Sequence, residues 1–166
     1  MFSRFLFSKK RKAFPPIAAH QHKKEGPHID PIEAKNIPPL MLAYIGDAVY
    51  ELAVREHLLH SGMVKMDRLH SAAVAYVNAS RQSQLWGEIE AFLSPEQREV
   101  FRRGRNAKSG HQPPHSTVGE YRRATGLEAL IGYLHLTGDQ AQLERIFATL
   151  FQAEEEASLP ETASHS

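Results

Sequence analysis

The sequence predicts an all-α fold, and three observations support that prediction. Apolar residues recur at helical spacing over long stretches, most clearly in 38–59 and 117–136. No stretch alternates apolar and polar residues in the way that a half-buried strand does. At Ser94 and at Thr117 a hydroxyl residue is followed three positions later by Gln or Glu, a pattern typical of helix starts. We therefore expect a single helical domain.

The first expected helix covers roughly residues 38–59. Asn36 is its candidate cap, Pro38 and Pro39 fit its first turn, and Gly62 is its stop signal. The helix carries a glycine and an aspartate among aliphatic neighbours in "AYIGDAVYEL", and both residue types are poor helix formers. Intrinsic helix propensity therefore does not explain why a glycine and an aspartate occur in this helix.

A second helical region is expected over 67–93, with a break or bend near Asn78 because "YVNASRQ" weakens the apolar periodicity. The segment "KSGHQPPHS" is a loop by its Gly and Pro content, and Gly138 marks the end of the helix that follows it. Three further helices are expected, over 94–106, 117–136 and 139–153.

Charge divides the chain into three parts. Residues 1–24 hold seven Lys and Arg and no Asp or Glu, whereas 154–166 hold four Glu and no Lys or Arg. We expect a basic disordered tail over 1–30, a folded domain over 31–154 and an acidic disordered tail over 155–166. An organelle-targeting role for the basic tail is the alternative to a cytoplasmic location. No apolar run approaches the ~20 residues of a membrane-spanning helix, so no membrane partner is expected.

The chain has no cysteine, which excludes a thiolate nucleophile and sulfur ligands for a metal. A hard cation such as Mg²⁺, held by oxygen ligands, is then the default expectation for any metal.

Two acidic residues lie inside apolar helices that also contain glycine. Asp47 follows Gly46 on the first helix, and Glu128 precedes Gly132 by one turn in "ATGLEALIGYL". Glycines at a helix crossing let two backbones approach closely, so both carboxylates could reach one cation. The alternative is that each acid is paired with an arginine or capped by a local hydroxyl.

The motifs "YIGDAVYEL" and "EALIGYLHL" resemble the two signature helices of the ribonuclease III superfamily, and "RRGRNAKSG" is similar to a stretch of its short, Mini branch. The resemblance covers roughly residues 38–151. It implies an α-helical nuclease domain that forms a homodimer, binds Mg²⁺ through carboxylates and cuts double-stranded RNA to leave 5′-phosphate and 3′-hydroxyl ends.

Carried over residue by residue, the resemblance makes Asp47 and Glu128 the catalytic residues and metal ligands. Two further acids of the larger relatives are replaced here by Ala43 and Thr125. This reduced pair resembles the Mini branch. Thr125 is expected to orient a water beside the metal, and Glu51, four residues beyond Asp47, is a candidate to support the site.

A basic stretch precedes the second signature helix. "REVFRRGRNAK", residues 98–108, holds five Lys and Arg against one Glu. Such a run is often only a solvated face, but here we expect it to contact RNA phosphates and 2′-hydroxyls. The expected RNA-binding residues are Arg102, Arg103, Arg105, Asn106, Lys108 and Ser109.

The function that the sequence predicts is a Mg²⁺-dependent endoribonuclease for double-stranded RNA. The Mini branch implies maturation of the large-subunit (23S) ribosomal RNA precursor and leaves room for a ribosomal-protein helper. The alternative is a non-catalytic, ribosome-associated RNA-binding subunit that kept the fold after losing acids. Retention of both Asp47 and Glu128 argues against that alternative.

Overall fold

The computed structural model describes residues 28–63, 65–108 and 116–157, and within them every regular element is helical. The expected all-α fold is confirmed. The expected tails lie almost wholly outside the described residues. In chain order the elements are α1 (Pro31–Asn36), α2 (Pro39–His60), α3 (Met66–Val77), α4 (Ala79–Ile89), the 3₁₀ turn η2 (Glu90–Phe92), α5 (Pro95–Asn106), α6 (Val118–Thr137) and α7 (Gln140–Ala157).

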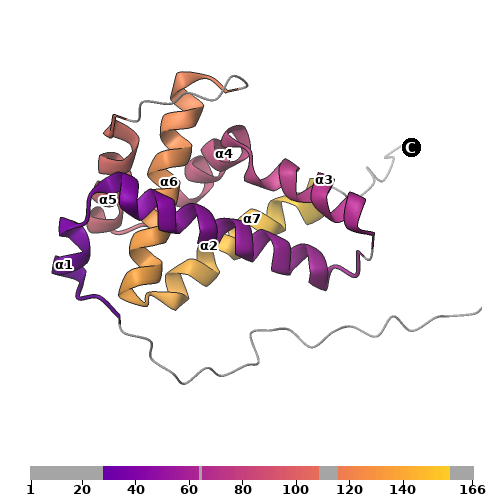
Figure 1. Ribbon diagram of the computed structural model, residues 1–166, viewed down its shortest axis with the longest axis horizontal. Coiled ribbons are helices and arrows are strands. Elements are labelled where there is room, and N and C mark those ends of the chain that lie inside the picture. The colour runs from indigo at the N-terminus through magenta and orange to yellow at the C-terminus, as the bar shows by residue number, and fades with distance from the viewer. Residues whose placement is uncertain (1–27, 64, 109–115, 158–166) are drawn as a thin grey trace, which may run out of the picture.

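Helix α6 is the centre of the fold. It packs against α1, α2, α4, α5 and α7, and α2 crosses in front of it (Figure 1). All residues from Ala124 to Leu134 except Glu128 are buried. A helix that is buried on all sides needs small and apolar residues all round, which explains the apolar sequence of this segment.

The two helix starts that the sequence predicts are confirmed. The Ser94 hydroxyl accepts from the Gln97 N–H (3.2 Å) while the Gln97 side chain accepts from the Ser94 N–H (3.0 Å). Thr117 and Glu120 make the same reciprocal pair at the start of α6. These bonds satisfy backbone N–H groups that a helix end leaves without partners.

The predicted break near Asn78 is also confirmed, and its cause is a cap. The Asn78 side chain accepts from the Arg81 N–H (2.9 Å) and donates to the Ala75 carbonyl oxygen (2.7 Å). One side chain thus starts α4 and closes α3. Gly138 ends α6 with a φ of 74°, a left-handed conformation that suits glycine.

The beginning of the domain differs from the expectation. Asn36 does not cap the first long helix: it is the last residue of α1, a short helix that the periodicity did not reveal, and α2 starts at Pro39 behind Pro38. Asp30 caps α1 by accepting from the Ile32 N–H. A six-residue helix is too short to show an apolar period, so its presence depends on this cap and on packing against α6.

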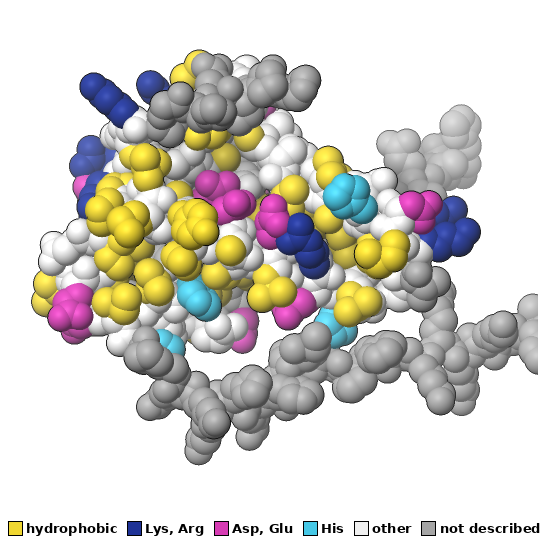
Figure 2. All heavy atoms as spheres, viewed as in Figure 1, with side chains coloured by type: hydrophobic (Ala, Val, Ile, Leu, Met, Phe, Trp, Pro, Cys, Tyr) yellow, Lys and Arg dark blue, Asp and Glu magenta, His cyan; other side chains and the backbone are white. Residues whose placement is uncertain are grey.

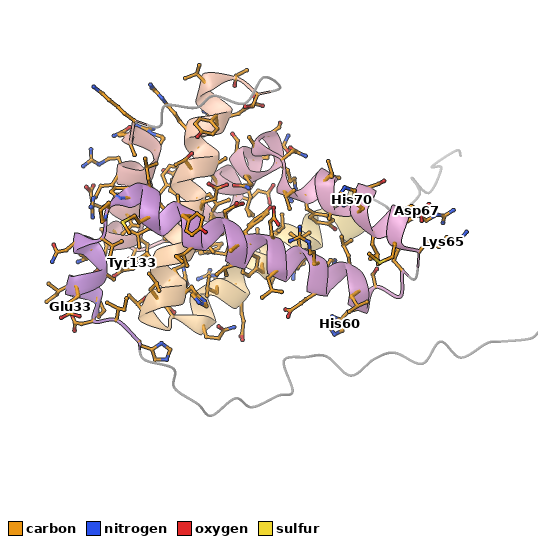
Figure 3. All side chains as sticks on the ribbon, viewed as in Figure 1. Glu33, His60, Lys65, Asp67, His70 and Tyr133 are labelled. Carbon is orange, nitrogen blue, oxygen red and sulfur yellow. The ribbon has the colours of Figure 1, made fainter. Side chains whose placement is uncertain are left out.

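Polar contacts fasten α1 to the rest of the molecule. Tyr133 of α6 donates its hydroxyl to Glu96 of α5 (2.6 Å), and Glu96 also pairs with Lys35 of α1 (2.8 Å). Tyr133 lies at the α1 end of the molecule, far from the α2–α3 turn where His60 and Lys65 lie (Figure 3).

No helix among the described residues is long and apolar enough to span a bilayer.

Candidate active site

Helices α2 and α6 touch backbone to backbone where they cross. A Cβ atom added to Gly46 would overlap the carbonyl oxygen of Glu128 and lie 2.7 Å from the Gly132 nitrogen. A Cβ atom added to Gly132 would overlap the carbonyl oxygen of Leu42 and lie 3.0 Å from the Gly46 nitrogen. Glycine in a helix interior costs about 1 kcal/mol relative to alanine. Here the cost is offset by a crossing that no larger residue would allow.

The crossing sets the positions of the two acidic residues. Asp47 follows Gly46 on the exposed side of α2, whereas Glu128 lies one turn before Gly132 on α6 and is largely buried. Burial and, to a smaller extent, the negative charge of Asp47 together raise the pKa of Glu128 to about 8. The two carboxylates are therefore close enough to repel each other.

The Asp47 carboxyl group shows the same effects more weakly. Its pKa is raised by partial loss of hydration and by the charge of Glu51, and Arg55 acts in the opposite direction. Arg55 itself is paired with Glu51 at 2.5 Å. Within the described residues neither Asp47 nor Glu128 has a basic partner within ion-pair distance. The geometry thus disfavours the alternative in which each acid is neutralised by an arginine.

The positions where larger relatives carry two more acids are buried here. Ala43 and Thr125 are almost fully enclosed, and the Thr125 hydroxyl donates to the Tyr121 carbonyl oxygen (3.1 Å) one turn earlier on the same helix. The hydroxyl hydrogen is thus used within the helix, which leaves only the lone pairs of Thr125 to orient a water. Glu51 is held by Arg55.

A pocket of about 310 Å³ opens beside Glu128. Two of its polar side-chain atoms, Gln82 Oε1 and Ser116 Oγ, are buried and have no hydrogen-bond partner within the described chain. The pocket is lined by Val77, Asn78, Ala79, Gln82, Ser116, Tyr121, Ala124, Thr125 and Glu128. Sequence reasoning missed Gln82. The available signal was its place on the buried face of α4, at helical spacing from Leu85 and Ile89.

The expected RNA-binding residues on α5 fall into two groups. Arg102 makes two hydrogen bonds to Glu99, at 2.7 and 2.6 Å. Arg103 turns inward and donates to the backbone carbonyl oxygens of Lys35 (2.5 Å) and Ile37 (3.5 Å), which lie at the end of α1. The Arg103 guanidinium thus has a structural task in the described chain.

The second group, which is open to solvent as Arg102 is, makes no ion pair among the described residues. Arg105, Asn106 and Lys108 are exposed at the C-terminal end of α5, and Arg105 Nε makes a long bond to Asn106 Oδ1 (3.3 Å). Lys and Arg side chains gather at this corner in Figure 2. Ser109 lies outside the described residues.

Comparison with known proteins identifies the family. The Ribonuclease III domain family matches residues 40–139, a segment that contains both signature helices and the α2–α6 crossing. The chain belongs to the ribonuclease III family. This is a family of endoribonucleases, and the expected family membership is confirmed.

Several relatives of this ribonuclease III chain carry the name Mini-ribonuclease 3. One from Clostridium tetani is 38% identical over 134 residues, covering 80% of this chain and 89% of its own. One from Symbiobacterium thermophilum is 44% identical and covers 66% and 85%, and one from Desulfitobacterium hafniense is 52% identical and covers 60% and 62%. A crystal structure of a Fusobacterium nucleatum protein superposes with a TM-score of 0.67 at 32% identity, covering 74% of this chain and 98% of that one.

The donor set of this ribonuclease III chain suits a hard cation. No group of three or more His, Asp and Glu side chains comes together among the residues that the structure describes, so a metal would rely on the two carboxylates. The negative charge of Asp47 raises the affinity of Glu128 for a proton, and a divalent cation between the two carboxylates would relieve the same repulsion. Mg²⁺ commonly accepts one or two carboxylates and completes its octahedral shell with water and phosphate oxygens.

Proposed function

We propose that the chain is a Mg²⁺-dependent, homodimeric endoribonuclease that cleaves double-stranded RNA. We further propose that it acts, in the cytoplasm, on the large-subunit (23S) ribosomal RNA precursor. The observation that carries the proposal is the pair of unneutralised carboxylates, Asp47 and Glu128, at the glycine-lined crossing of α2 and α6. The ribosomal RNA substrate rests on resemblance to the Mini branch, because the name Mini-ribonuclease 3 states a ribonuclease and no substrate.

The two acids have different tasks in this proposal. Asp47 is exposed and would contact both the RNA backbone and the ion. Glu128 is largely buried at the α2–α6 crossing, where its carboxylate is less hydrated. When bound, Mg²⁺ would supply positive charge to the scissile phosphate and to the attacking water. Low hydration around Glu128 strengthens its attraction for a cation, because fewer waters compete for the carboxylate.

Exposed basic residues are proposed to hold the RNA. Arg105, Asn106 and Lys108 sit at the end of α5, immediately before the segment that leads into α6. Phosphate contacts from such residues give affinity without sequence information. The bonds made by Arg103 to the end of α1 make it a weaker candidate than Arg105 and Lys108.

An apolar face on α2 supports the homodimer. Met41, Tyr44 and Leu52 are 61%, 80% and 57% exposed and lie at helical spacing on one side of α2. Figure 2 shows hydrophobic side chains spread over this face of the molecule. Because large apolar patches on soluble proteins mark contact sites, we propose that this face packs against a second copy. Asp47 lies on the same helix, so the two active sites of a dimer would flank the interface.

Cleavage of duplex RNA by the purified protein, with Mg²⁺ and with EDTA, tests the proposal. We expect Mg²⁺-dependent products with 5′-phosphate ends, and Asp47→Asn or Glu128→Gln should abolish most cleavage while leaving duplex binding intact. A duplex from the 23S precursor and an unrelated duplex of equal length form the two substrate arms. Duplex binding without cleavage at any Mg²⁺ concentration would instead favour the non-catalytic RNA-binding subunit. Full activity in either variant would reject the assigned acids.

A further inference from the structure

Gln82 is an unusual residue to find in the interior of this fold. It is 2% exposed and shares the buried face of α4 with Leu85 and Ile89, which are fully buried. A buried polar group destabilises the folded protein when it is left without hydrogen-bond partners. A glutamine at this position therefore needs a compensating contact or a task.

The contacts of Gln82 point toward the active site. Gln82 and Glu128 line the same pocket, and the Gln82 side chain lowers the pKa of Glu128 by favouring its ionised form. Its Nε2 also lies 3.4 Å from the Val77 carbonyl oxygen, near the limit for a hydrogen bond. Its Oε1 is buried without a partner in the described chain and borders the pocket beside Glu128.

A purely structural role does not account for these contacts. The start of α4 is already capped by Asn78, so the long bond to Val77 adds little to that end of the helix. An apolar side chain of similar length would fill the same space without the unpartnered oxygen. The Glu128 carboxylate, which lines the same pocket, is the remaining group that the Gln82 amide can serve.

Glu128 has few other groups to fix its orientation. It has no ion-pair partner among the described residues, and the Thr125 hydroxyl one turn away donates to its own helix backbone. A site with only two carboxylates depends more on the orientation of each than a site with four. Groups that hold a metal ligand in place commonly contribute 10–100-fold to metal affinity or activity.

We propose that Gln82 is a positioning residue for Glu128: its amide N–H holds the Glu128 carboxylate at the α2–α6 crossing, and its unpartnered Oε1 accepts from a water in the adjacent pocket. This inference rests on the proposed metal site of Asp47 and Glu128. In this proposal α4 contributes the residue that orients the Glu128 carboxylate. Gln82 itself neither binds the metal nor contacts RNA.

The test replaces Gln82 by methionine, which has similar length and flexibility but cannot hold the carboxylate. Gln84→Met is the matched control, because Gln84 is exposed on the same helix. Three quantities are measured: binding of Mn²⁺ to the RNA-free protein by electron paramagnetic resonance, kcat and KM for a duplex RNA, and the thermal midpoint. Mn²⁺ stands in for Mg²⁺ because both prefer oxygen ligands.

For Gln82→Met we expect about 10-fold weaker Mn²⁺ binding and a similar fall in kcat, with KM and the thermal midpoint close to wild type. Gln84→Met should change none of them. Wild-type Mn²⁺ affinity and kcat in Gln82→Met would overturn the inference. If wild-type protein neither binds Mn²⁺ nor cleaves RNA, the proposed metal site fails as well, so the two failures are distinguishable.

A measurement on the intact side chain covers the case in which Gln82→Met does not fold. The side-chain amide protons of Gln82 are followed by NMR in wild-type protein and in Glu128→Gln. We expect one amide proton to be shifted downfield in the wild type and to lose that shift in the variant. Identical amide shifts in both proteins would show that Gln82 does not hold Glu128.

Discussion

Replacing Glu128 by glutamine should stabilise the metal-free protein at high pH and leave its stability unchanged at low pH. Burial and the charge of Asp47 raise the pKa of Glu128 from 4.5 to about 8 in the folded protein. The folded state therefore holds the Glu128 proton between pH 4.5 and 8, where the unfolded state has released it. Since the folded state binds more protons in this window, the free energy of unfolding falls as pH rises through it.

The expected magnitude follows from the same pKa difference. The rise of the Glu128 pKa from 4.5 to about 8, at about 1.4 kcal/mol for each tenfold change in proton affinity, gives on the order of 5 kcal/mol, fully present only above pH 8. Glutamine has the shape of the protonated acid and cannot ionise, so Glu128→Gln escapes this loss. For a domain of this size the difference corresponds to a rise in thermal midpoint of roughly 15 °C relative to wild type at pH 9. At pH 5 the two midpoints should agree within a few degrees.

Thermal and urea unfolding in EDTA at pH 5 and pH 9 would measure this difference. Glu90→Gln, which makes the same change of charge on the exposed turn η2, is the control and should not show a pH-dependent gain. Adding Mg²⁺ at pH 9 should stabilise wild type more than Glu128→Gln, because a ligand stabilises only the state that binds it. Equal stability of wild type and Glu128→Gln at pH 9 would refute the conclusion that this carboxylate is unpaired and poorly hydrated.

Three further predictions concern the crossing, the RNA contacts and the dimer. Gly46→Ala should cost roughly 4 kcal/mol of stability or prevent folding, as urea unfolding would show, because its Cβ would overlap backbone atoms of α6. Arg105→Ala combined with Lys108→Ala should weaken binding to all duplexes and lower the slope of log affinity against log salt by roughly 2, measured by fluorescence anisotropy. Tyr44→Glu should convert the dimer into a monomer in light scattering, because it places a charge in the proposed interface.

The chain offers a control for each of these variants. Gly87→Ala, on the exposed side of α4 with nothing within 4 Å of the added Cβ, should stabilise by about 0.5–1 kcal/mol. Lys65→Ala with Arg68→Ala removes the same charge near the α2–α3 turn and should leave RNA binding unchanged. Val118→Glu should leave the dimer intact. The prediction for the crossing would be contradicted if Gly46→Ala folded with wild-type stability. The prediction for RNA binding would be contradicted if the slope of log affinity against log salt did not change, and the prediction for the interface if Tyr44→Glu remained a dimer.

Local sequence determined most of the helices of this protein. The starts of α5 and α6 and the break between α3 and α4 follow from hydrogen bonds that span three or four residues, so the residues that specify them are adjacent in the sequence. The glycine inside the first long helix, Gly46, likewise indicated a close crossing with the glycine-containing second signature helix. The sequence pattern did not predict α1, because a helix of six residues has fewer than two turns and shows too little periodicity.

Only the tertiary structure decided which polar side chains serve the site and which serve the fold. Arg103 looked equivalent to Arg105 within one basic run, but it reaches backbone oxygens of α1 that are 66 and 68 residues away in the chain. Gln82 shares a face of α4 with Leu85 and Ile89, but only the packing of α4 against α6 shows that this face buries it beside Glu128. The physical reason is that the helical period of 3.6 residues determines only which residues share a face of a helix. Which of these faces is buried depends on packing against elements that are distant in the sequence.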